Sequence, residues 1–120
     1  MPRILIVDDS VAMRQMTSAT LLGSGYELVQ ACDGREALQL ATEQPFDLVI
    51  TDVNMPNMDG IALVRALRAL ANYRSKPLLL LTTEASATRK AEAREAGASA
   101  WMLKPFNAER LLATVARFIK

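Results

Sequence analysis

The chain has 120 residues, of which 51% are hydrophobic and 22% charged, and its formal net charge is +1. This length suits one ordinary domain with a single core, and we expect that domain to span residues 1–120. The near-neutral charge gives no electrostatic case for a nucleic-acid or membrane partner, because both usually need a concentrated basic surface. One cysteine excludes an internal disulfide, and the absence of histidine excludes an imidazole base or a phosphohistidine in this chain.

The chain opens with a short apolar run, and similar runs alternate with helix-like segments to its end. The first run, Ile4–Val7, is too short for a signal sequence or a membrane span, so a cytoplasmic protein is expected. The alternation is typical of a βαβ series. Strands are predicted over residues 4–7, 27–32, 46–51, 78–81 and 99–103. Helices are predicted over residues 11–22, 35–42, 60–70, 86–96 and from the Asn107 N-cap to 119.

The predicted helices differ in the apolar surface that they offer. The first is expected to use one face made of Ala12, Met16, Ala19 and Leu22. The fourth has only alanines at its apolar positions, so it should be weakly anchored and should shift readily, or else be a plain surface helix. Cys32 is interpreted as an inert buried thiol, and the methionines, including Met13 and Met16, as core filling.

Near-continuous apolar strands and right-handed crossovers predict an α/β fold, a doubly wound parallel sheet of five strands with helices on both faces. The expected strand order is 2-1-3-4-5, the order of flavodoxin-like folds. In that order the strands deliver polar side chains to a single edge of the sheet. These side chains are Asp8 and Asp9 after the first strand, Asp52 after the third, Thr82 after the fourth and Lys104 after the fifth.

Carboxylates gathered in this way repel one another unless a cation lies among them. Mg²⁺ prefers oxygen ligands and is usually held by one or two carboxylates with waters, which suits Asp9 and Asp52 with Asp8 behind a water. Phosphoryl transfer needs in-line positioning and neutralisation of the equatorial oxygens, which Mg²⁺, Lys104 and Thr82 can supply. Asp52, at the tip of a central strand, is the candidate nucleophile.

These residues resemble the receiver domains of two-component response regulators, most closely the single-domain chemotaxis type with its CheY-like fold. The resemblance covers the whole chain. It is carried by Asp8-Asp9-Ser10, Asp52, Asn54-Met55-Pro56, Met58-Asp59-Gly60, Thr82, Gly97-Ala98 and Lys104-Pro105-Phe106.

The resemblance implies phosphotransfer to Asp52 from a CheA-like histidine kinase, with Mg²⁺ on Asp9, Asp52 and the backbone carbonyl of Asn54. It also implies that Lys104 and Thr82 contact the phosphoryl group, and that the peptide bond from Lys104 to Pro105 is cis. A chain of this kind catalyses only its own phosphorylation and dephosphorylation.

Three positions bear on signalling. Trp101 stands where the family usually has Tyr, Phe or His as a rotamer switch coupled to Thr82, and a packing tryptophan is the alternative. Asn54 and Glu84 stand at two positions that tune the lifetime of the phosphoryl group in this family. They match the members with fast turnover, so the resemblance implies a short-lived phosphoryl group here. Phosphorylation should change the surface made by the fourth helix, fifth strand and fifth helix.

Expected partners of this monomer are the kinase, a phosphatase and a downstream protein such as the flagellar motor switch, with a phosphate-sink role as the alternative.

Three other readings remain open. A magnesium-dependent phosphatase working through an aspartyl-phosphate usually has a second acid two residues after its nucleophile, where this chain has Asn54, and a substrate cap that 120 residues do not accommodate. A flavodoxin-type cofactor binder would need a phosphate loop after the first strand, where Asp8 and Asp9 would repel phosphate. A receiver kept as a plain interaction module would fail to be phosphorylated.

Overall fold

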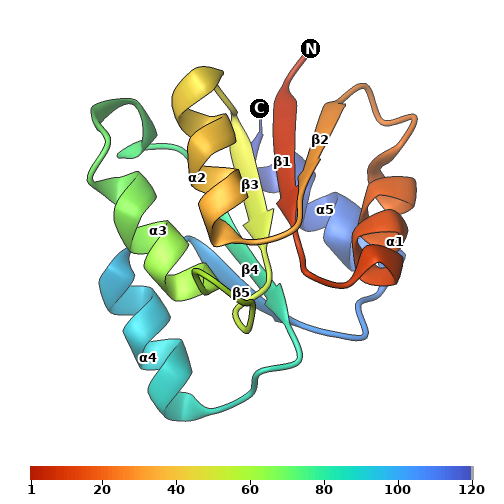
Figure 1. Cartoon of the computed structure of the whole chain (residues 1–120). Coiled ribbons are helices and arrows are strands. Elements are labelled where there is room, and N and C mark those ends of the chain that lie inside the picture. Colours follow the sequence, from red (N-terminus) through yellow and green to blue (C-terminus); the bar gives the residue numbers. More distant parts are fainter. Residues whose placement is uncertain (120) are drawn as a thin grey trace.

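A computed structural model describes residues 1–119, in which a parallel sheet lies between two layers of helices (Figure 1). The strands pair in the order β2-β1-β3-β4-β5, which confirms the predicted fold. The strands are β1 (Arg3–Val7), β2 (Glu27–Ala31), β3 (Leu48–Thr51), β4 (Leu78–Thr82) and β5 (Ala100–Leu103). The helices are α1 (Val11–Leu21), α2 (Gly34–Glu43), α3 (Gly60–Arg68), the 3₁₀ turn η1 (Ala71–Tyr73), α4 (Ala87–Ala96) and α5 (Ala108–Phe118).

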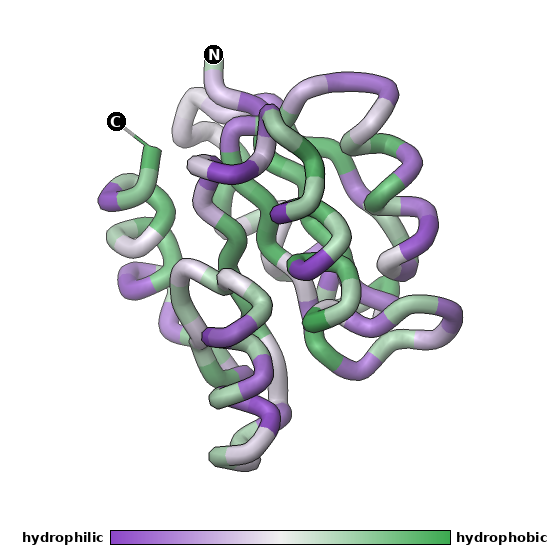
Figure 2. The backbone as a smooth tube through the Cα atoms, turned by 90° about the vertical axis from the view of Figure 1, so that its left-hand side faces the viewer, coloured by the Kyte–Doolittle hydropathy of each residue, from purple (hydrophilic) through white to green (hydrophobic). Residues whose placement is uncertain are grey.

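Alternate residues of each central strand enter different cores. In β1, Ile4 and Ile6 pack with Leu111 of α5 and the other side chains of the α1–α5 layer. Leu5 and Val7 face the opposite layer, formed by α2, α3 and α4. Because both faces of the sheet are covered, these strands are apolar except for Arg3, Thr51 and Thr82 at their ends, and show no polar alternation. Figure 2 shows the apolar residues concentrated along the strands in the middle of the fold.

The predicted face of α1 is wrong. Met16 and Leu22 are 54% and 74% exposed, whereas Thr17 and Leu21 are buried. The helix begins after the N-cap Ser10 and ends at Leu21, so Leu22 is its C-cap and does not belong to the buried stripe. Since one residue turns a helix by about 100°, choosing Leu22 over Leu21 rotates the whole predicted face toward solvent.

The prediction of a buried thiol at Cys32 is also wrong. β2 ends at Ala31, one residue earlier than expected, and Cys32 lies exposed in the turn that leads to α2. A hydrogen bond with the Glu36 side chain, with a smaller effect of partial desolvation, raises the pKa of this thiol. The Cys32 sulfur is therefore accessible but is held in its protonated form, which is the less nucleophilic one.

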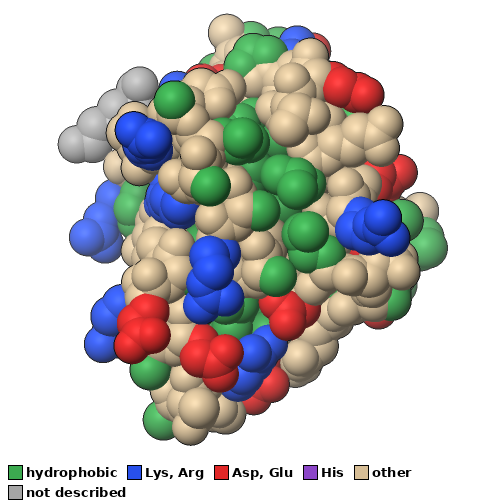
Figure 3. Space-filling model, turned by 60° about the vertical axis from the view of Figure 1, so that its left-hand side comes forward, with side chains coloured by type: hydrophobic (Ala, Val, Ile, Leu, Met, Phe, Trp, Pro, Cys, Tyr) green, Lys and Arg blue, Asp and Glu red, His purple; other side chains and the backbone are tan. Residues whose placement is uncertain are grey.

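The weak anchoring predicted for α4 agrees with its burial. Only Ala93 and Ala96 of this helix are buried, whereas α3 buries five residues, among them Leu63 and Leu67. The side of the molecule that carries α3 and α4 shows basic and acidic side chains close together at one end (Figure 3). An ion pair joins Arg89 of α4 to Asp59, the N-cap of α3, at 3.3 Å. None of the helices among residues 1–119 is long and apolar enough to cross a bilayer.

Candidate functional site

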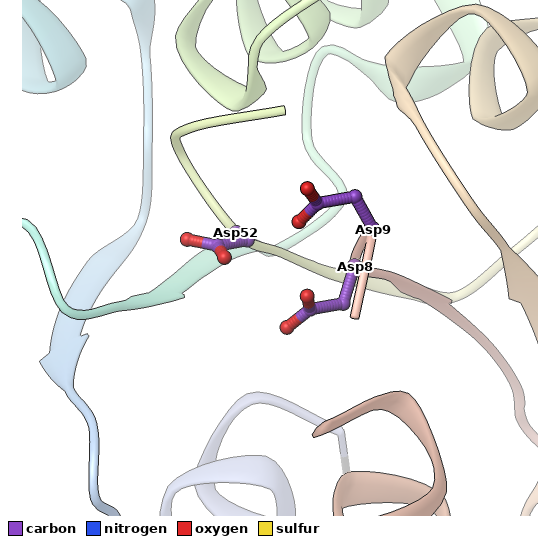
Figure 4. Close-up of side chains that lie close together, drawn as sticks. All are labelled: Asp8, Asp9 and Asp52. Atoms are coloured by element: carbon purple, nitrogen blue, oxygen red, sulfur yellow. The ribbon is translucent and has the colours of Figure 1, made fainter. Parts of the chain in front are cut away.

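Three carboxylates meet where β1 and β3 end (Figure 4). Asp8 and Asp9 follow β1, and Asp52 follows β3, which is paired directly with β1 in the sheet. One oxygen of each carboxylate lies within 4.8 Å of the others. The parallel pairing of the two strands therefore brings together residues that are more than forty positions apart, as predicted.

Lys104 joins this cluster from the end of β5. Its Nζ donates hydrogen bonds to Oδ2 of Asp8 at 2.5 Å and to Oδ2 of Asp52 at 3.1 Å. Burial alone would lower the pKa of Lys104, but the hydrogen bond to Asp8 and the charge of Asp52 outweigh it, so the pKa lies above its ordinary value. The Lys104–Pro105 peptide bond is cis, as the resemblance implied.

The loop after β1 is held by contacts that position Asp8. One carboxylate oxygen of Asp8 accepts the backbone N–H of Ser10 at 2.9 Å, while Ser10 itself caps α1. The guanidinium of Arg14 donates to the backbone carbonyl of Asp8 at 2.6 Å and to the side chain of Gln30 on β2. Sequence reasoning missed Arg14, because nothing in the pattern of α1 distinguishes it from an exposed arginine.

Asp9 differs from the other two carboxylates. It is exposed, and among residues 1–119 its side chain makes no hydrogen bond or ion pair within the fold. A free carboxylate next to two others is a donor set that suits a hard divalent cation. The cluster can therefore hold a metal ion, with Asp9 as the ligand that no protein group already occupies.

The cluster opens into a cavity of about 320 Å³. Its other walls are largely apolar and come from α1 and from the segment after β5: Met13, Met16, Pro105 and Phe106. The prediction that Met13 and Met16 only fill the core is therefore wrong. Thr83 lines the same cavity. Thr82, in contrast, is fully buried, and its hydroxyl accepts the backbone N–H of Glu84.

Two other predicted residues meet at the rim of the site. The amide nitrogen of Asn54 donates to Oε1 of Glu84 at 3.3 Å, which joins the loop after β3 to the loop after β4. This contact places side by side the two residues that the family resemblance links to the lifetime of a phosphoryl group.

Trp101 lies on β5, away from the carboxylates, and packs against the core beneath α4. Its indole nitrogen is buried and has no hydrogen-bond partner among residues 1–119. Cavities of about 340 and 170 Å³ lie against it, and Lys90 of α4 lines both. The indole therefore has unused hydrogen-bonding capacity and free space next to it.

Comparisons with known proteins agree with this geometry. The model of the response regulator receiver domain matches residues 4–116. Chemotaxis protein CheY4 of Vibrio cholerae has a similar structure, with a TM-score of 0.92–0.93, 49% identity and 99% of each chain covered. The receiver domain of the sensor histidine kinase PA1611 of Pseudomonas aeruginosa, solved with a magnesium ion coordinated in its active site cleft, has a TM-score of 0.91 at 30% identity, with 98% of this chain and 97% of that chain covered.

Longer regulators also match the chain. It is 41% identical to the response regulator FleR of P. aeruginosa over 115 residues, which are 96% of this chain but 24% of FleR. Other curated relatives are matched over half of their length. The chain thus corresponds to one part of these relatives.

Proposed function

The chain belongs to the response regulator receiver domain family, and on this premise we propose that residues 1–120 act as one receiver domain that takes a phosphoryl group from a histidine kinase onto Asp52. Receiver domains are signalling proteins of two-component systems, so the relevant product of the phosphotransfer is the phosphorylated protein itself. The observation that carries the proposal is the meeting of Asp8, Asp9, Asp52 and Lys104 at the carboxyl edge of the sheet.

Asp52 is the proposed phosphoacceptor. In the transfer, a carboxylate oxygen of Asp52 attacks phosphorus, an O–P bond forms, and the N–P bond to the kinase imidazole breaks. The imidazole leaves with the electron pair of that bond. Asp52 is suited to this role because its carboxylate lies at a strand end, next to the cavity, with one oxygen already held by the N–H of Val53 at 2.7 Å.

Asp8, Asp9, Asp52 and the backbone carbonyl of Asn54 are the proposed holders of Mg²⁺, which would neutralise charge on the phosphoryl oxygens when bound. Unpartnered Asp9 supports this assignment, and so does the magnesium ion in the similar PA1611 receiver domain. Lys104 would move its charge from the two carboxylates to the phosphoryl group, and Thr82 would contact a phosphoryl oxygen after turning its hydroxyl away from the N–H of Glu84.

The proposed output is a change in protein binding at the surface made by α4, β5 and α5. Movement of Thr82 would shift the loop before α4, whose two buried alanines hold it weakly. Trp101, with its unpartnered N–H and the cavities next to it, would respond to that shift as the switch residue together with Thr82. Asn54 and Glu84 would set the lifetime of phospho-Asp52 through their mutual contact.

The likeness to chemotaxis protein CheY4 supports a role in chemotaxis. The proposed partners are a CheA-like histidine kinase, a flagellar motor switch protein and a phosphatase, with the chain acting as a cytoplasmic monomer. Its own catalysis would be limited to gaining and losing the phosphoryl group on Asp52.

The experiment that tests this function is intact-mass measurement after incubation with Mg²⁺ and acetyl phosphate. We expect one phosphoryl adduct that is stable in acid, labile in base and absent from Asp52→Asn. Asp47→Asn is the matched control, because Asp47 lies before β3, away from the cluster, and should leave the adduct intact. No adduct on the wild-type chain, together with no effect of fluoroberyllate on Trp101 fluorescence, would overturn the proposal in favour of a plain interaction module.

A further inference from the structure

The loop of residues 52–59 joins β3 to α3 and carries Asn54. A hydrogen bond joins the two ends of the loop, because the N–H of Gly60 donates to the carbonyl of Val53 at 2.8 Å. Gly60 also packs so closely that a Cβ at this position would lie 1.9 Å from the carbonyl oxygen of Asp52. The base of the loop is therefore fixed by its own backbone, but this contact does not reach the middle of the loop.

The tip of the loop is held by the start of α2. The side-chain amide of Asn57 donates to Oδ2 of Asp33 at 2.7 Å, and the N–H of Gly34 donates to the carbonyl of Met58 at 3.2 Å. A Cβ at Gly34 would lie 2.5 Å from that same carbonyl oxygen, so the approach is as close as glycine permits. These contacts join segments that are 24 residues apart in the chain.

Asn57 has the positive φ of 69° that non-glycine residues rarely adopt. Asparagine tolerates this conformation better than most residues, but an exposed loop residue has no packing to keep it there. Asp33 supplies the missing restraint with one oxygen, while its other oxygen caps α2 by accepting the N–H of Glu36 at 2.9 Å. Asp33 thus couples the conformation of the loop to the rigid end of a helix.

We propose that Asp33 and Asn57 are positioning residues for the metal site: their hydrogen bond holds the loop in the conformation that presents the Asn54 carbonyl toward Asp9 and Asp52. The inference rests on the proposed function, in which that carbonyl is a metal ligand. Neither residue touches the metal or the phosphoryl group. Their hydrogen bond keeps the Asn54 carbonyl in its binding orientation before Mg²⁺ arrives. Binding of Mg²⁺ then does not include the entropic cost of ordering the loop.

The test uses two variants that remove the same hydrogen bond from opposite sides. Asn57→Gly keeps the positive φ accessible and deletes the amide, while Asp33→Ser keeps an N-cap oxygen for α2 but is too short to reach Asn57. We expect each to weaken Mg²⁺ binding about tenfold by calorimetry, and the double variant to be no weaker than either single one. Saturating Mg²⁺ should restore the rate of phosphorylation by acetyl phosphate.

Tyr73→Phe is the control for stability. It removes the hydrogen bond that the buried hydroxyl of Tyr73, in η1, donates to the carbonyl of Ala41 near the C-terminal end of α2, away from the Asp33 N-cap, and should leave Mg²⁺ affinity unchanged. A second readout needs no metal: in EDTA the amides of Gly34 and Met58 should exchange hydrogen faster in both loop variants.

The outcomes separate this inference from the function on which it rests. If the wild type binds Mg²⁺ and both loop variants bind it equally well, the positioning role is wrong while the metal site stands. Additive losses in the double variant would also overturn it, because they would show two independent effects. If the wild type binds no Mg²⁺, the proposed metal site fails, and the positioning role fails with it.

Discussion

The ammonium group of Lys104 contacts two of the three clustered carboxylates, those of Asp8 and Asp52, but not that of Asp9. Lys104 is closer to Asp8 than to Asp52 and contacts both, so the carboxylate of Asp9 lies beside two other acids without an ion-pair partner among residues 1–119. Such an arrangement is tolerated because Asp9 is exposed to water, which screens the repulsion. Asp9, the proposed metal ligand, is therefore expected to weaken the metal-free protein.

Asp9→Ala should stabilise the protein in EDTA and destabilise it, relative to wild type, in Mg²⁺. Without metal, the substitution removes repulsion worth a few tenths of a kcal/mol. With free Mg²⁺ about tenfold above its dissociation constant, the wild type should gain about 1.4 kcal/mol that the variant does not. Urea unfolding in both buffers measures the two differences. A variant that is less stable than wild type in EDTA would contradict this account of Asp9.

Asp33 gives a prediction for acid solution. Its hydrogen bonds from the N–H of Glu36 and then from Asn57 hold the pKa of this carboxyl below its ordinary value of 3.8. A depressed folded-state pKa means that the charged carboxylate stabilises the fold fully above pH 3.8, and that this stabilisation is lost as the pH falls through the folded-state value.

Asp33→Asn, which is neutral at every pH, should therefore be less stable than wild type near neutral pH, by only a few tenths of a kcal/mol, because Asn still caps the helix and water screens the lost charge. The difference should disappear in acid below the folded-state pKa. Chemical unfolding at a series of pH values measures it, and a difference that stays constant into strong acid would show that the charge of Asp33 is not its cause.

At the scale of elements, α4 is held mainly at its C-terminal end. Gly97 ends the helix with a φ of 107°, and its carbonyl accepts hydrogen bonds of 2.9 and 2.8 Å from the Arg68 guanidinium. The same guanidinium donates to the carbonyls of Tyr73 and Lys76 before β4. Arg68 thus ties the end of α4 to α3 and to η1, while the first turn of α4 is held by the Arg89 ion pair with Asp59.

Arg68→Ala should cost about 2–3 kcal/mol of unfolding free energy, because it leaves partly buried carbonyls without their charged donor. Arg65→Ala, on the exposed side of the same helix, is the matched control and should be nearly neutral. Urea denaturation of the two variants measures the difference. Equal losses in both would mean that the Arg68 contacts carry no special stability.

The elements themselves were predictable, but several of their contacts were not. Strands and crossover helices follow from local apolar patterns, and the site follows because parallel strands end at one edge. The contacts of Arg14 and Arg68, and that of Asp33 with Asn57, depend on where separate elements come to lie, which no local pattern records. The wrong face of α1 has a simpler origin, since Leu21 and Leu22 are equally apolar and only the helix end distinguishes them.

At the scale of the whole molecule, the structure predicts which segments should change conformation when the proposed phosphorylation occurs. Mg²⁺ with fluoroberyllate should change amide hydrogen exchange in the loop before α4, in the first turns of α4 and along β5. The last turn of α4, held by Arg68, and the α1–α5 core around Leu111 should change little. Exchange measured by mass spectrometry checks this distribution, with Asp52→Asn as the control. A uniform change across the sheet would contradict a local switch.

The N-terminus and the end of α5 lie at the same edge of the sheet, opposite the acidic site (Figure 1). Anything joined to either end, whether a fluorescent protein, a surface linker or another folded unit, would therefore extend away from Asp52 and leave the mouth of its cavity open. The same arrangement makes the fold suitable for engineering, because reporters attached at both ends would not obstruct the proposed site.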